Sequence, residues 1–159
     1  MNGWSDSDQA MMQAALAEAR VATEEGEVPV GAIVVLSDRI IGRGHNRSIE
    51  DHDPSGHAEI VALRAAGQSQ KNHRLVGATL FVTLEPCAMC VGALIQARVA
   101  RLVFGAYDKK AGALGSVIDL SAERRLNHRF EVNGGLLADD CGELLSRFFE
   151  AQRSAASSV

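Results

Sequence analysis

The sequence contains no apolar run of the roughly 18 residues that a helix needs to cross a bilayer. Its first residues, MNGWSDSDQAMM, lack the basic start and apolar stretch of a secretory signal. These two absences lead us to expect a cytoplasmic protein that does not contact a membrane. Internal repeats and domain linkers are missing too, so we expect a single domain over residues 1–159.

Cysteine is scarce, with only Cys87, Cys90 and Cys141 in the chain. Cys87 and Cys90 are too close together to staple a fold, and in a cytosolic protein such a pair more often binds metal or performs redox chemistry. The formal net charge of −4 argues against a protein that coats nucleic acid non-specifically, but it does not exclude a local basic patch around a specific site. A hydrophobic share of 47% and a charged share of 23% are those of an ordinary globular domain.

Hydrophobic periodicity predicts helices that alternate with short apolar strands. We expect helices over 6–25, 57–67, 87–98 and 138–153, and strands over 28–36, 40–46, 78–84, 99–105 and 129–132. The first two strands are separated only by a short turn and should be antiparallel, whereas strands joined through helices should be parallel. The pattern therefore predicts an α/β fold with three layers, α/β/α, around a mixed five-stranded sheet. The stretch 106–116 is expected to be a functional loop, and the tail 154–159 to be disordered.

Two short motifs carry the chemistry: HAE at 57–59 and PCAMC at 86–90, each at a predicted helix start. Cys87 and Cys90 are three residues apart, so one helical turn places both sulfurs on the same side. The free N–H groups and partial positive charge of a helix N-terminus favour thiolate, the form that binds metal. With His57 as a third ligand the set suits zinc, because two thiolates balance the dication and one tetrahedral position stays open for water.

Glu59 lies two positions after His57 and is expected to carry protons rather than to bind the metal. Zinc can lower the pKa of a water molecule to about 7, and a carboxylate beside that water can take its proton and deliver it elsewhere. This pair suits hydrolytic attack on an electron-poor carbon. Two alternatives stay open: a redox-active or accidental CxxC, and a closed structural site with Cys141 as fourth ligand. Cys141 falls inside an amphipathic helix pattern, where a small buried side chain is more common.

The combination of HxE with PCxxC is similar to the signature of zinc-dependent deaminases, the cytidine and deoxycytidylate deaminase superfamily. The segments EVPVGAIVV, HAEIVALR and TLEPCAMCVGAL are compatible with several deaminases, including those that act on cytidylate and guanine. The segments VFGAYDKKAGALGS and NHRFEVNGGLLADDCGELLSRFF resemble more specifically the bacterial tRNA-specific adenosine deaminases. This resemblance extends from about Trp4 to Arg153, nearly the whole chain.

The resemblance implies a cytidine deaminase-like fold and one Zn²⁺ per chain, held by His57, Cys87 and Cys90, with Glu59 as the catalytic proton shuttle. It further implies a homodimer that converts adenosine to inosine at the wobble position of a tRNA anticodon loop. Such a loop is single-stranded, so its base can enter a pocket at low cost. The family's substrate-binding positions fall on Asn46, which would hydrogen-bond the flipped adenine, and on Asp108, Lys110, Asn127 and Phe149.

Each of these RNA contacts has a simpler alternative. Asn46 can merely end a strand, and Asp108 and Lys110 can be solvated loop charges. Of the adjacent Phe148 and Phe149, one is expected in the core while the other stacks on a base, a role also open to Tyr107. The acidic net charge means that RNA must meet local cations, for which the candidates are Arg98, Arg101, Lys109, Lys110 and Arg129. Four further histidines show no metal pattern: His45, His52, His73 and His128.

Two rival functions remain at this stage. A small-molecule deaminase, acting on guanine, cytosine or cytidylate, would use the same zinc chemistry. A non-enzymatic binding protein with a structural zinc would not need Glu59.

Overall fold

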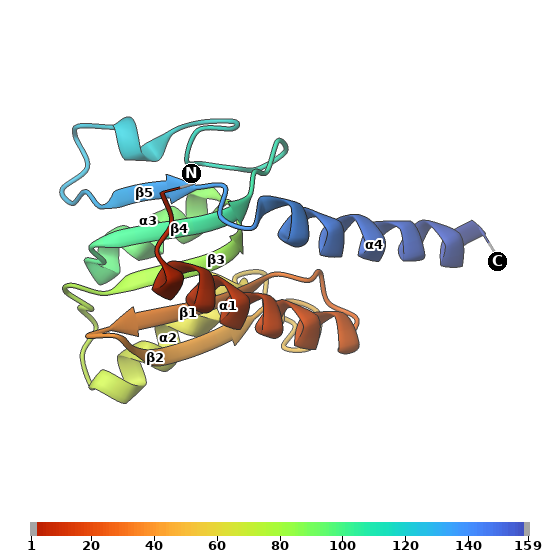
Figure 1. The fold of residues 1–159 in the computed structure, drawn as a ribbon, viewed down its shortest axis with the longest axis horizontal. Helices are drawn as coiled ribbons and strands as arrows, with labels where there is room; N and C mark the ends of the chain where they lie inside the picture. Colours follow the sequence, from red (N-terminus) through yellow and green to blue (C-terminus); the bar gives the residue numbers. More distant parts are fainter. Residues whose placement is uncertain (1–2, 158–159) are drawn as a thin grey trace.

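The computed structural model describes residues 3–157, which form three layers, α/β/α, around one five-stranded sheet (Figure 1). This confirms the expected fold class. Within residues 3–157 there is no helix with the length and apolarity to span a membrane. The elements in chain order are α1 (Asp6–Glu24), β1 (Gly31–Leu36), β2 (Arg39–His45), α2 (Ala58–Gln70), β3 (Thr79–Leu84), α3 (Ala88–Ala97), β4 (Arg101–Ala106), the 3₁₀ helix η1 (Leu120–Ala122), β5 (Glu131–Gly134) and α4 (Ala138–Ser157).

The sheet has the order β2-β1-β3-β4-β5. β1 and β2 are antiparallel, as their short connection predicts, and their turn places Ser37 and Asp38 at positive φ, 51° and 63°, as in a type I′ hairpin turn. β3 pairs antiparallel with β1 and parallel with β4, and β4 pairs parallel with β5. The mixed sheet is therefore confirmed, although a loop with η1, rather than an α-helix, connects β4 to β5.

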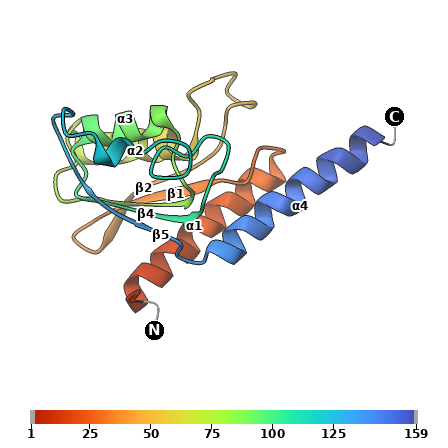
Figure 2. The ribbon, with the colours of Figure 1, turned by 90° about the horizontal axis from the view of Figure 1, so that it is seen from above.

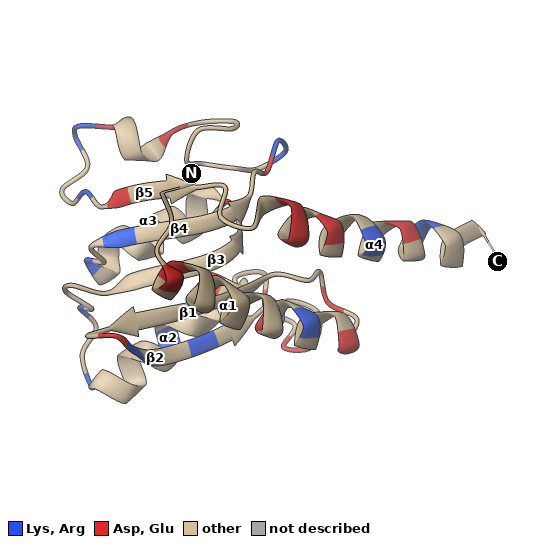
Figure 3. Cartoon of the chain, viewed as in Figure 1, with Lys and Arg blue, Asp and Glu red and all other residues tan. Residues whose placement is uncertain are grey.

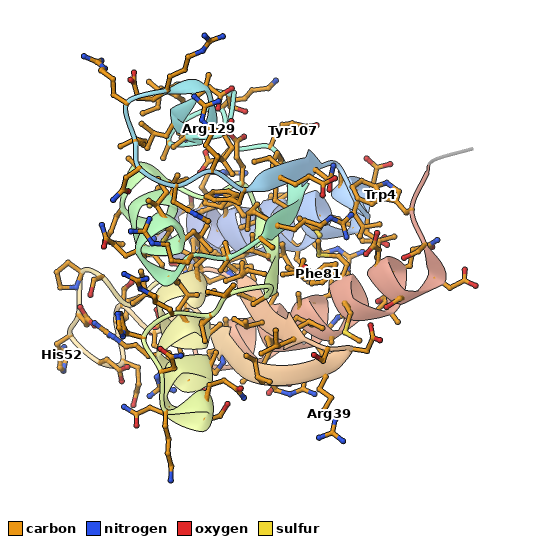
Figure 4. All side chains as sticks on the ribbon, turned by 90° about the vertical axis from the view of Figure 1, so that its left-hand side faces the viewer. Trp4, Arg39, His52, Phe81, Tyr107 and Arg129 are labelled. Carbon is orange, nitrogen blue, oxygen red and sulfur yellow. The ribbon has the colours of Figure 1, made fainter. Side chains whose placement is uncertain are left out.

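The helices form two layers, with α1 and α4 on one face of the sheet and α2 and α3 on the other (Figure 2). Phe81 and Val103 pack with Met12 of α1 on the first face, where Figure 4 shows Phe81 between sheet and helix. Their neighbours in the strands, such as Val82 and Leu102, face the cluster under α2 and α3. Because both faces are buried, the central strands are apolar at almost every position.

The close approach of α2 to β2 determines where the first motif lies. Gly44 has no room for a side chain, since a Cβ there would lie 2.5 Å from the nitrogen of Ala62 and 2.6 Å from the carbonyl oxygen of Ala58. Gly42 meets the backbone of the same helix in the same way. The helix therefore lies directly on the strand, and its N-terminus is held beside the end of β2.

α2 runs further than the sequence pattern predicts, through Gly67 to Gln70. A single glycine costs a helix only about 1 kcal/mol, so the packing of α2 on the sheet overrides it. The helix ends instead at Lys71, whose φ of 52° is left-handed.

α4 also continues beyond its expected end, because residues 154–157 of the tail predicted to be disordered are helical. Alanine at 155 and 156 favours helix, and the Ser157 hydroxyl donates to the Arg153 carbonyl. Residues 158–159 lie outside the described residues. The outer part of α4 projects beyond the sheet (Figures 1 and 2).

Candidate active site

One end of the sheet gathers the residues of both motifs. β3 leads into Glu85 and Cys87, and β4 leads into Asp108, so these side chains follow the carboxyl ends of neighbouring parallel strands, where α/β sheets bind ligands. Asn46 joins them from the end of β2, with its backbone N–H donated to the Val30 carbonyl at 3.1 Å. A pocket of about 200 Å³ opens at this end, lined by Val28, Val30, Asn46, His57, Ala58, Glu59, Leu84, Glu85, Cys87, Asp108 and Ala111.

The three predicted metal ligands come together here. His57 is the N-cap residue of α2 and Cys87 that of α3, yet neither side chain caps its helix. His57 Nδ1 lies 3.6 Å from Cys87 Sγ and 3.5 Å from Cys90 Sγ. All three donor atoms lie within 4.8 Å of one another, and among residues 3–157 no other group of three or more His, Cys, Asp or Glu has this property. The group has the composition and spacing to hold a metal ion.

The charges in this group favour a cation. Hydrogen bonds from Cys90 and His57 lower the pKa of Cys87 to about 3. The pKa of Cys90 is raised, because it donates its proton to the Cys87 thiolate and because it is buried. The hydrogen bond with Cys87 in turn raises the pKa of His57. One thiolate is therefore present before any metal binds, and a metal ion would have to displace the proton of Cys90.

Glu59 lies in the first turn of α2 with only 4% of its surface exposed, and it lines the same pocket. Burial raises its pKa to about 7, opposed by its own backbone N–H and by the charge of His57. It also accepts a hydrogen bond from Cys90. A carboxyl group that titrates near neutral pH beside the metal-ligand group can both give and take protons.

The structure adds two buried acids that the sequence analysis missed, Glu27 and Glu85. Glu27 is fully buried and accepts the backbone N–H groups of Ile49 at 3.2 Å and Glu50 at 2.8 Å, which holds the loop leading to His57. Glu85 lines the pocket. Glu85 could have been noticed from the sequence, because it is a glutamate at the end of an apolar strand, directly before the PCxxC motif.

Two predicted substrate contacts lie in the pocket wall. Asn46 is half-buried, and its side-chain oxygen accepts the Ser48 hydroxyl at 3.4 Å. Asp108 orders its own turn, because its carboxylate accepts the backbone N–H groups of Lys110 at 3.0 Å and Ala111 at 3.2 Å. Lys110 is exposed on this same loop after β4.

Asn127 and Phe149 lie elsewhere on the chain. Asn127 is exposed near the amino end of β4, where its side chain accepts a hydrogen bond from Arg98 at 3.3 Å. Phe149 is 44% exposed on α4 and meets the half-buried Phe148 edge-on, with ring centroids 5.4 Å apart. The structure brings neither residue to the pocket of its own chain, and their contacts with RNA stay predictions.

One of the candidate cations needs correction. Arg101 forms a two-pronged ion pair with Asp8, at 2.9 and 3.1 Å, and also donates to Asn133 at 2.7 Å. It lies at the start of β4, the end opposite the pocket, so its role is to join α1, β4 and β5. The other four candidates include Lys109, Lys110 and Arg129, which are exposed. Basic and acidic residues alternate along much of the ribbon (Figure 3).

Cys141 and the extra histidines His45 and His52 are not part of the metal-ligand group. Cys141 is 1% exposed in the cluster that includes Met12 and Leu16, on the opposite face of the sheet from α3. Burial raises its pKa to about 12. Cys141 is therefore not a fourth metal ligand. This agrees with the helical pattern around it, which predicts a small buried side chain. His45 contacts two carboxylates of the α1 region, and His52 stands on an exposed loop (Figure 4).

Known proteins with similar sequences are deaminases. A model of the MafB19-like deaminase family matches residues 6–153. The chain is 49% identical over 150 residues to the tRNA-specific adenosine deaminase of Haemophilus influenzae, covering 94% of this chain and 87% of the relative. It is 44% identical over 146 residues to that of Bacillus subtilis, covering 92% and 91% of the two chains.

Solved structures that are similar to this chain are also deaminases, and they act on two different kinds of substrate. A structure from studies of A-to-I editing by tRNA:A34 deaminases matches with a TM-score of 0.83 and 43% identity, covering 86% of this chain and 99% of that one. A guanine deaminase from Nitrosomonas europaea matches with a TM-score of 0.74 and 28% identity, covering 88% and 83%. With the His/Cys/Cys group and the buried glutamate in contact with each other, the chain belongs to the deaminase family and, within it, to the tRNA-specific adenosine deaminases.

Proposed function

We propose that this chain deaminates adenosine to inosine at the wobble position of a tRNA anticodon, with one Zn²⁺ held by His57, Cys87 and Cys90. The observation that carries the proposal is the buried carboxyl group of Glu59, which lines the pocket and is hydrogen-bonded to Cys90 of the metal-ligand group. One imidazole nitrogen and two sulfurs form a donor set that zinc takes in hydrolytic sites. When bound there, zinc would supply a water molecule activated near neutral pH.

Glu59 would carry the protons of the reaction. In its protonated form it donates to N1 of adenine, which makes C6 more electrophilic. As a carboxylate it takes a proton from the attacking water and passes it to the departing amine, and it regains a proton from the hydroxyl group on C6 as the carbonyl of inosine forms. Water and adenosine are consumed, and inosine and ammonia are released, so the glutamate returns to its starting state.

The pocket fits one flipped-out base. Its volume of about 200 Å³ is smaller than that of the sites that hold drug-sized ligands, so the rest of the anticodon loop must remain outside. Val28, Val30 and Leu84 supply apolar walls for the faces of the base. Asn46 offers an amide donor and an acceptor to its edge.

The remaining contacts follow the anticodon loop outward. Asp108 lies at the wall of the pocket and Lys110 on the exposed part of the same loop, where a cation meets phosphate. The exposed ring of Phe149 offers a stacking surface, and Asn127 a further polar contact. Both lie away from the pocket of their own chain, which is compatible with the proposed homodimer; sedimentation of a monomer at working concentration would contradict that arrangement.

A substrate panel tests the function. The enzyme is given the anticodon stem-loop of an arginine tRNA with adenosine at the wobble position, and separately free adenosine, guanine, cytosine and cytidylate. We expect inosine in the stem-loop and release of one ammonia per inosine, with no turnover of the free compounds. A stem-loop with that adenosine moved by one position serves as the matched control. Turnover of guanine or another free compound, with none of the stem-loop, would decide for the small-molecule alternative.

A further inference from the structure

We propose that Glu85 is a positioning residue that fixes the loop 108–116 as one wall of the substrate pocket. The expected effect on turnover rests on the proposed function, whereas the expected effect on the loop structure does not. Glu85 is 2% exposed and lies between the end of β3 and the metal-ligand motif, two residues before Cys87.

The Glu85 carboxylate joins both ends of the loop. One oxygen accepts the backbone N–H of Asp108 at 3.1 Å and the hydroxyl of Ser116. The other oxygen accepts the backbone N–H groups of Leu114 at 3.0 Å and Ser116 at 3.1 Å. A single side chain thus replaces the partners that these loop amides would otherwise find in water.

These four bonds distinguish Glu85 from a second proton carrier. A carboxylate offers about four acceptor positions, and all four are occupied by donors of the protein. No acceptor position is left for a substrate, although Glu85 lines the pocket. Burial would raise its pKa, but the hydrogen bonds from Ser116 and from the backbone of Asp108 and Leu114 outweigh burial and hold the pKa below its usual value.

Gly112 provides independent support. A Cβ at this position would lie 2.4 Å from both Cδ and Oε2 of Glu85, and 2.6 Å from the carbonyl oxygen of Asp108. The Gly112 N–H donates to that same carbonyl at 2.9 Å. The loop therefore closes over the carboxylate only because residue 112 has no side chain.

The loop also connects to the metal-ligand motif. The N–H of Ala113 donates to the carbonyl of Pro86 at 2.8 Å, directly before Cys87. Asp108, at the other end of the loop, forms part of the pocket wall. Glu85 thereby sets the distance between the metal-ligand motif and the side chain expected to meet RNA.

The test is Glu85→Gln, which keeps the size of the side chain but turns two acceptor positions into N–H groups that face other donors. Hydrogen exchange at the amides of Asp108, Leu114 and Ser116 should accelerate at least about tenfold relative to amides in β3. Metal content should stay at that of the parent. Turnover of the stem-loop, measured as kcat/KM, should fall by about 10- to 100-fold, since a 1 Å displacement of a substrate-binding group costs up to about 100-fold.

Two further variants keep the test decisive. Gly112→Ala places a methyl group against the same carboxylate. Its effects on hydrogen exchange and on kcat/KM should therefore not add to those of Glu85→Gln in the double variant. Ser116→Ala removes a single donor and should give a weaker form of the same loss if Glu85→Gln does not fold. Glu150→Gln, an exposed acid on α4, is the matched control and should change none of these measurements.

Unchanged exchange of the three amides in folded Glu85→Gln or Ser116→Ala would overturn the proposal. So would loss of one limb of the pH–kcat profile in Glu85→Gln, because a positioning residue lowers the whole profile without altering its shape. If the parent enzyme does not act on the stem-loop, the proposed function fails, while hydrogen exchange still decides the role of Glu85.

Discussion

Replacing Glu59 with glutamine tests the catalytic proposal with very little change in shape. The amide has the size of the carboxyl group, and its oxygen can still accept one of the hydrogen bonds now made by Cys90 and the Glu59 backbone N–H. It cannot give up a proton near neutral pH. General acid–base groups contribute about 10²- to 10⁴-fold to a reaction rate. The kcat on the stem-loop should therefore fall by at least about 100-fold, while the metal content stays unchanged.

The same substitution should stabilise the metal-free protein at alkaline pH. Burial raises the pKa of Glu59 from 4.5 to about 7, so the folded state binds its proton more tightly than the unfolded state does. Below pH 4.5 Glu59 is protonated in both the folded and the unfolded state, and its burial then costs no stability through ionisation. As the pH rises toward 7 the parent loses stability, up to about 3 kcal/mol, because each pK unit corresponds to about 1.36 kcal/mol. Glutamine does not ionise and avoids this loss.

The assay is urea unfolding of the metal-free parent and of metal-free Glu59→Gln at pH 4.5 and pH 8, alongside single-turnover deamination with metal restored. We expect a more stable variant at pH 8 only, together with loss of turnover. Retained turnover would remove Glu59 from the reaction. Equal stability of the two proteins at pH 8 would show that burial does not raise its pKa as the structure indicates.

Two further substitutions test the metal group and the packing that positions it. Cys87→Ser should reduce the metal content well below one per chain by elemental analysis, because a serine hydroxyl stays protonated, whereas Cys141→Ala should keep full metal; full metal in Cys87→Ser would rule out Cys87 as a ligand. Gly44→Ala should destabilise the fold by roughly 1–3 kcal/mol and lower Tm, since its Cβ would meet the backbone of α2. Gly92→Ala, where a Cβ meets nothing within 4 Å, is the matched control; equal Tm values for the two alanine variants would contradict the close packing of α2 on β2.

The cysteine pair of the metal-ligand group was predictable because its spacing is local, whereas His57, 30 positions from Cys87, was assigned because its HxE motif occurs together with PCxxC. His57 and Cys87 each open a helix, and Cys90 follows one turn after Cys87, so spacing alone orients the two sulfurs. The same holds for the strands, whose apolar runs identify a sheet buried on both faces. Element boundaries were less accurate, as the passage of α2 through Gly67 shows, because tertiary packing outweighs the weak propensity of one residue.

Arg101 and Glu85 show what local patterns cannot supply. As a cation near the deaminase-like segments, Arg101 was a reasonable RNA contact, but its partner Asp8 is 93 positions away in the chain. Glu85 carries no spacing signal, since its four bonds reach a loop more than 20 residues further on. Partners so distant in sequence become neighbours only when the sheet has assembled.

By itself, the sequence determined the types of donor atom, their helical spacing, and an alternating order of helices and strands that leads to this sheet. Only the tertiary structure decided that Cys141 is buried on the opposite face from the metal-ligand group, that Glu59 is shielded enough to titrate near pH 7, and that Asn127 lies away from its own pocket. The physical reason is the range of each effect. Helical spacing acts over three or four residues, whereas burial and charge depend on every neighbour that folding brings within a few ångströms.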